Sequence, residues 1–140
     1  MDPLDFLRVA RNLSGLGQEA EWRTSVGRSY YALFNNLRLK LEPIKPFPGD
    51  EEDHQRVVYY LMKANNRDLQ SVGQWLKDLR NSRNDADYRM NVVVGQDQSR
   101  LAITRADKAI AKFTGVNAAT LRVVIGAIAT YRSRRESENR

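Results

Sequence analysis

The sequence VGRSYYALFN at positions 26–35 decides how this chain folds, because its residues separate onto two faces of a helix. At about 100° per residue, the apolar side chains from here to position 41 fall on one stripe. The stripe consists of Val26, Tyr30, Leu33, Phe34, Leu37 and Leu41, with Trp22 at its margin. Glu21, Arg28 and Asn35 lie nearly opposite, and Tyr31 lies to one side. The stretch therefore predicts a long helix with one face in the core and a separate polar face that is a candidate for function.

A second stretch, LRNSRNDADY at positions 79–88, places charges within the apolar face of another predicted helix. The apolar arc of that helix consists of Leu69, Val72, Leu76, Leu79 and Met90. Arg83 falls inside the arc, and Arg80 and Asp87 lie on its border. Because a buried charge without a partner is costly, we expect Arg83 to meet Asp87 one turn away, a residue of another helix, or a ligand phosphate. Arg83 and Asp87 should then face Arg28 or Tyr31 of the long helix, or a second protomer.

Length and composition predict one all-α domain. The chain has 140 residues, which suffices for a single core, and its long stretches without Pro or Gly are typical of helices. Helices are predicted near residues 3–14, 18–41, 50–64, 68–88, 98–113 and 117–133, and residues 90–95 are predicted as an ordered connection. We expect an antiparallel bundle of about five to six helices within residues 1–140. Residues 1–115 would form the core bundle, 116–133 an extra apolar helix and 134–140 a polar tail.

The last predicted helix is apolar nearly all round, from Val123 to Ala129. This run is far shorter than the roughly 20 residues that span a bilayer, and Arg122 interrupts it, so we predict no membrane span. A helix that is apolar on both sides is expected to be buried on both sides. One of those sides would then be covered by a partner protein.

Residue types exclude most classes of enzyme. The chain has no cysteine and a single histidine, His54, so it lacks a thiolate metal site, a paired-histidine zinc site and a catalytic triad with a spare base. It also has no glycine-rich phosphate loop. The acidic run at positions 50–53 is explained by the start of a helix, whose dipole favours carboxylates. We therefore predict neither a metal nor a cofactor.

The charge of the chain favours a nucleic-acid partner. The net charge is +6 and the isoelectric point is near 9.8, although four arginines of the segment 131–140 supply part of the excess. A basic balance of this kind suits a polyanion such as RNA or DNA. The first residues resemble neither a secretory leader nor a transit peptide, so we expect a cytoplasmic protein.

The two motifs together resemble the HEPN superfamily (higher eukaryotes and prokaryotes nucleotide-binding), in particular its small prokaryotic members. The resemblance rests on Arg-x-Tyr-Tyr-Ala-x-Phe at 28–34 and Leu-Arg-x-x-Arg-x-x-Ala-Asp-Tyr at 79–88. His54 fits the place where many relatives have a histidine. The resemblance implies a HEPN-type helical bundle that acts in a homodimer or in a complex with a partner such as a nucleotidyltransferase. It also implies a place in a toxin–antitoxin or antiviral defence system.

HEPN ribonucleases cut RNA without a metal, using an arginine followed four to six residues later by a histidine. Here the positions after Arg80 hold Asp85, Ala86 and Asp87, and no histidine is available. A carboxylate with a pKa near 4 is a poor proton donor at neutral pH. The residues that the resemblance assigns to catalysis are therefore Arg80 and Arg83 with Asp85 or Asp87.

Three hypotheses remain open at this point. The first is a binding module, in which Arg28, Arg80 and Arg83 hold RNA or a nucleotide without cutting it. The residues predicted to contact the nucleic acid are Arg28, Tyr31, Asn35, His54 and Tyr88. The second is an active metal-independent endoribonuclease, and the third is a non-catalytic helical subunit of a larger complex.

Overall fold

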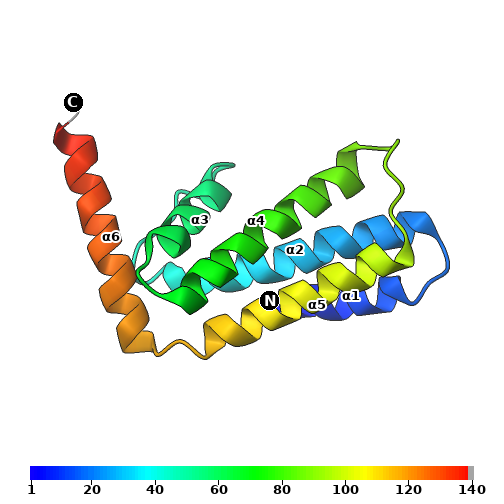
Figure 1. Ribbon diagram of the computed structural model, residues 1–140, viewed down its shortest axis with the longest axis horizontal. Coiled ribbons are helices and arrows are strands. Elements are labelled where there is room, and N and C mark those ends of the chain that lie inside the picture. Colours follow the sequence, from blue (N-terminus) through cyan, green and yellow to red (C-terminus); the bar gives the residue numbers. More distant parts are fainter. Residues whose placement is uncertain (139–140) are drawn as a thin grey trace.

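The computed structural model describes the backbone of residues 1–138 and the side chains of residues 1–128. Within residues 1–138 it contains six helices and no strand, so the prediction of an all-α bundle is confirmed (Figure 1). The helices are α1 (Leu4–Ser14), α2 (Glu19–Leu41), α3 (Asp53–Lys63), α4 (Arg67–Tyr88), α5 (Gln96–Thr114) and α6 (Ala118–Glu138). Residues 90–95 form a connection between α4 and α5, as predicted.

Helix α2 lies at the centre of the bundle. It packs against α1, α4 and α5, and Figure 1 shows α4 running beside it in the opposite direction. The stripe predicted from the sequence is the face that is buried, since Leu33, Leu37 and Leu41 are fully inaccessible to solvent. Each such side chain contributes roughly 1.5–3 kcal/mol by leaving water.

Helix α4 buries the arc predicted for it, except at its end. Leu69, Val72, Leu76 and Leu79 are fully buried. Met90 was predicted to share this arc, but α4 ends at Tyr88, so Met90 falls in the connection and is 67% exposed. Gly73 lets α3 approach α4 closely, because a Cβ atom at this position would lie only 3.1 Å from the Cβ of Leu61.

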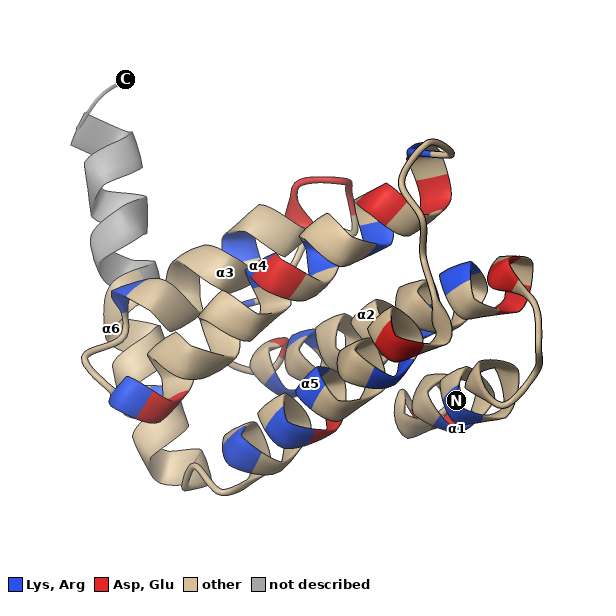
Figure 2. Cartoon of the chain, turned by 45° about the vertical axis from the view of Figure 1, so that its right-hand side comes forward, with Lys and Arg blue, Asp and Glu red and all other residues tan. Residues whose placement is uncertain are grey.

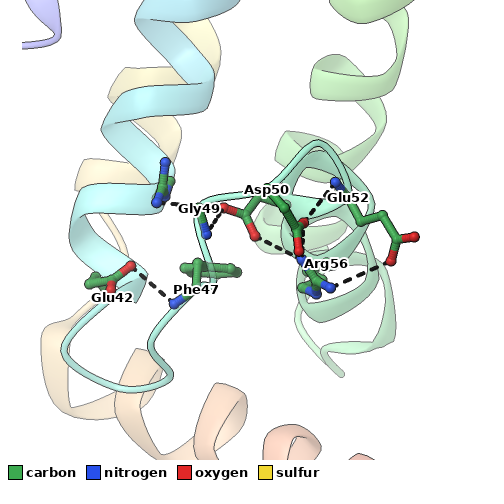
Figure 3. Close-up of polar contacts among 8 residues, drawn as sticks. Glu42, Phe47, Gly49, Asp50, Glu52 and Arg56 are labelled. Carbon is green, nitrogen blue, oxygen red and sulfur yellow. Dashed lines mark hydrogen bonds and ion pairs between the residues drawn. The ribbon is translucent and has the colours of Figure 1, made fainter.

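Helix α3 begins at Asp53 rather than at the predicted Asp50, because Asp53 is fixed by a network of its own. Its carboxylate is 2% exposed, accepts a hydrogen bond from the backbone N–H of Gly49 at 2.9 Å, and pairs with Arg38 at 3.5 Å and Arg56 at 2.9 Å. Figure 3 labels two of these partners, Gly49 and Arg56. Asp50 instead pairs with Arg56 at 2.6 Å. The network joins α2, α3 and the proline-rich connection between them, and Gly49 there has a φ of 87°.

Helix α6 is longer than predicted, and one of its sides is buried within the chain. It continues to Glu138, beyond the predicted end at 133, and in Figure 1 it projects away from the bundle beside α3. Leu121 and Ile125 are buried, whereas Val123 on another side is 71% exposed. Up to residue 128, α6 is therefore buried on one side and open on another. The basic side chains of the segment 131–140 lie outside the described residues, and no helix in the described part of the chain could cross a membrane.

Candidate functional site

Arg83 lies between two tyrosines on the outer side of the α2–α4 contact. Its guanidinium is 5.5 Å from the ring centroid of Tyr31 and 5.4 Å from that of Tyr88. Its Nε lies 2.8 Å from the carboxylate of Asp87, although the N–H does not point along this line, so the contact is an ion pair rather than a hydrogen bond. The side chain is 19% exposed. The predicted pairing with Asp87 and the predicted contact with Tyr31 are both confirmed.

Arg28 joins the same row of side chains through α1. Its guanidinium lies 5.6 Å from the ring of Phe6, and the rings of Phe6 and Tyr31 are 6.5 Å apart. We call this row the arginine–aromatic surface and define it by the following residues from three helices: Phe6, Arg28, Tyr31, Arg83 and Tyr88. Each cation–π contact of a solvent-accessible arginine contributes about 0.5–1 kcal/mol.

A buried hydrogen bond lies behind this surface. The hydroxyl of Tyr30 is 2.8 Å from Nδ1 of His54, and both residues are buried. Burial, followed by the nearby positive charge of Arg80, lowers the pKa of His54 to about 4. Burial also raises the pKa of Tyr30 to about 12. Both side chains are therefore neutral at pH 7, and His54 packs within the bundle, hydrogen-bonded to Tyr30.

Arg80 carries a charge that no carboxylate balances. The side chain is half-buried, and among the side chains of residues 1–128 it forms neither a hydrogen bond nor an ion pair. Its field nevertheless acts on Tyr30 and His54. Together with Arg28 and Arg83 it makes three arginines, for which Asp87 is the one carboxylate partner in the described part of the chain. The surface and its surroundings therefore have a local excess of positive charge.

Arg83 is held in its charged form by the same surroundings. Its burial disfavours the charge, but Tyr31, Asp87 and Tyr88 outweigh this effect and raise the pKa of Arg83 above its ordinary value. Figure 2 shows that Lys and Arg residues also lie on α5, so the positive charge of the protein is spread over several helices. What distinguishes the α2–α4 site is that its arginines lie among aromatic rings.

Two predicted site residues lie elsewhere. Asp85 is two residues after Arg83 and so points away from it; it pairs with Arg89 at 3.3 Å. Asn35 lines a cavity between α1 and α2 with Phe6 and Arg38. The structure therefore brings Arg80, Arg83, Asp87, Tyr31 and Tyr88 together with the buried His54, and it separates Asp85 from them.

Arg23 positions the site, and the sequence analysis missed it. From α2 its guanidinium donates hydrogen bonds to the carbonyl oxygens of Asp85 (3.3 Å), Ala86 (2.9 Å), Arg89 (3.3 Å) and Val92, and it also pairs with Glu19. Ala86 lies in the last turn of α4, where carbonyl oxygens lack partners within the helix, and Arg89 and Val92 lie in the connection that follows. The last turn of α4 has no basic residue of its own, a signal that a cation from another helix is needed there.

Comparisons with known proteins add one relative. An uncharacterised protein of Methanocaldococcus jannaschii is 29% identical to this chain over 112 residues, which cover 64% of this chain and 62% of the relative. The chain therefore spans less than two thirds of that relative's length. No model of a protein family matches the chain, and no solved structure matches it.

Replacing Arg23 by alanine should destabilise the protein. The Arg23→Ala variant removes the side-chain hydrogen bonds that tie the end of α4 and the connection after it to α2, so we expect the free energy of unfolding to fall by about 2–4 kcal/mol. Arg11→Ala is the matched control, since Arg11 forms an exposed ion pair with Asp107 and should contribute less than about 1 kcal/mol. Urea denaturation of both variants measures the difference, and equal small losses would show that Arg23 does not hold α4.

His54 should make stability depend on pH. The unfolded chain protonates His54 below about pH 6.5, but the folded chain does so only near pH 4. Stability from this residue is therefore complete above about pH 6.5 and is lost as the pH falls toward 4, by up to about 3 kcal/mol. Subtracting the unfolding free energies of His54→Gln from those of the wild type across this range removes the contribution of the carboxylates. Parallel curves for the two proteins would contradict the assignment.

Proposed function

We propose that this chain is a HEPN-type protein that binds RNA or a nucleotide through the arginine–aromatic surface and Arg80. One observation carries the proposal: Arg80 is half-buried, next to neutral Tyr30 and His54, and has no carboxylate partner among the described side chains. Removing a guanidinium from water without pairing it is unfavourable. A phosphate that docks beside Arg80 would supply the missing negative charge.

The surroundings of Arg80 suit a nucleic acid better than an isolated anion. Arginine recognises phosphate through a planar fork of donors and also stacks on rings. Tyr31 and Tyr88 offer ring faces to bases, and Tyr88 is 70% exposed. A flexible strand could therefore place phosphates on Arg28, Arg80 and Arg83 and a base against Tyr88.

The resemblance to HEPN proteins supplies the biological part of the proposal. Small prokaryotic members belong to toxin–antitoxin or antiviral defence systems, and we propose such a role in the cytoplasm for this chain. The acting form would be a homodimer or a complex with a cognate partner such as a nucleotidyltransferase. The exposed Tyr88, Met90 and Val93 beside the site offer apolar area for such a partner.

Endoribonuclease activity is a second candidate, favoured by one observation. The sequence has no histidine after Arg80, yet the fold brings His54 from α3 close enough for Arg80 to lower its pKa. Against this candidate, His54 is 8% exposed and neutral at pH 7, so it has no proton to give to a leaving group and little access to a substrate. Binding without cleavage therefore ranks first.

RNA binding should depend on salt and on the arginines of the site. We expect a short fluorescent single-stranded RNA to bind, with an affinity that falls steeply between about 50 and 200 mM salt. Arg80→Ala and Arg83→Ala should each weaken binding by about tenfold. Each should also reduce the slope of log affinity against log salt concentration by about one, the value for one lost phosphate contact. Fluorescence anisotropy measures both quantities.

Arg67→Ala is the control, because Arg67 is exposed at the other end of α4 and its loss changes the net charge equally. It should weaken binding by no more than about twofold. Binding that is independent of salt, or equally weak in all three variants, would overturn the proposal. Cleavage of the same RNA in a metal chelator, leaving a cyclic phosphate end, would favour the ribonuclease instead.

A further inference from the structure

A cavity of about 400 Å³ lies beside the arginine–aromatic surface, between α1 and the second half of α2. Its walls are formed mainly by Pro3, Phe6, Asn35, Arg38, Leu39 and Glu42. Its volume lies within the range of pockets that hold small organic molecules. The cavity is therefore a separate candidate site that neither Arg80 nor His54 lines.

Phe6 makes the cavity continuous with the arginine–aromatic surface. Its ring lines the cavity and also lies 5.6 Å from the guanidinium of Arg28 and 6.5 Å from the ring of Tyr31. Arg28, Tyr31 and Asn35 follow one another at intervals of three and four residues, so they share one side of α2. A ligand that extends along this side of α2 would contact the arginine and the cavity together.

Two polar side chains of the cavity have partners within the fold. Arg38 pairs with Asp53 at 3.5 Å, and the carboxylate of Glu42 accepts a hydrogen bond from the backbone N–H of Phe47 at 3.2 Å. The half-buried amide of Asn35 forms no hydrogen bond within the described residues. It offers both a carbonyl acceptor and an N–H donor to a ligand.

These features match a nucleobase, which has flat faces that stack on rings and a polar edge that pairs donors with acceptors. Phe6 supplies a ring face, Pro3 and Leu39 supply apolar walls, and the Asn35 amide supplies a donor and an acceptor. Arg28 stands beside Phe6, where the phosphate of the same nucleotide would lie.

We propose that this cavity binds one unpaired base of the RNA, with the Asn35 amide hydrogen-bonded to the edge of the base and Phe6 against its face. The inference rests on the proposed function, since it assigns a base site next to the phosphate site. It specifies the ligand as single-stranded RNA with accessible bases. A duplex, whose bases are stacked and paired, would not fit.

The test compares two probes of equal charge: a short single-stranded RNA and a phosphodiester oligomer of the same length without bases. Wild-type protein should bind the RNA about tenfold more tightly than the abasic oligomer. Asn35→Ala and Phe6→Leu should each remove most of this preference, so that the variant binds the RNA little better than the abasic oligomer. Asn12→Ala, an exposed residue on α1, should change neither affinity.

The outcomes separate this inference from the proposed function. If Arg80→Ala weakens binding of both probes but the wild type does not distinguish them, the base pocket is wrong and the phosphate site stands. If the wild type binds neither probe, both proposals fail. A preference that Asn35→Ala leaves intact would also overturn the base pocket, because it would then come from stacking on Tyr31 or Tyr88, which do not line the cavity.

Discussion

The packing of α2 against α4 is the interaction on which the rest of this structure depends. At Gly27 the two helices come close enough that a Cβ atom would lie 3.8 Å from the Asp87 carboxylate and 3.9 Å from Cγ of Arg83. This contact sets Tyr31 of one helix against Arg83 of the other. Arg23 then fixes the end of α4 from the same side of the long helix. Arg83 is therefore held in place by the fold, and the binding that we propose would lose less entropy for this side chain.

The charged groups at this contact are paired differently from those that stabilise the rest of the fold. The buried carboxylate of Asp53 is paired: it meets two arginines and a backbone N–H. At the α2–α4 site, in contrast, Arg80 lies partly out of water without a carboxylate among the described side chains. Sites of this kind reduce stability, and proteins tolerate them where binding or catalysis requires them.

The sequence alone predicted the elements well because their signals are local. The stripe from Val26 to Leu41 and the pair Arg83–Asp87 follow from helical spacing, and both are present. Contacts between distant parts of the chain could not be read in this way. Arg23 binds carbonyls more than 60 residues away, and no periodicity marks an arginine for that role. The hydrogen bond between His54 and Tyr30 joins α3 to α2, and helical spacing within either helix does not reveal it. Helix α6 buries Leu121 and Ile125, and the partner predicted for its open side stays a prediction.

The free energy of unfolding of Arg80→Leu tests the central claim most directly. Leucine keeps the apolar stem of the side chain and removes the charge that has no partner. If Arg80 is present for an external anion, the variant should be as stable as the wild type or more stable, by up to a few kcal/mol, as found when buried ions are replaced by apolar residues. A loss of about 3–5 kcal/mol, the usual result of breaking a satisfied buried pair, would contradict the account and identify Arg80 as part of the scaffold.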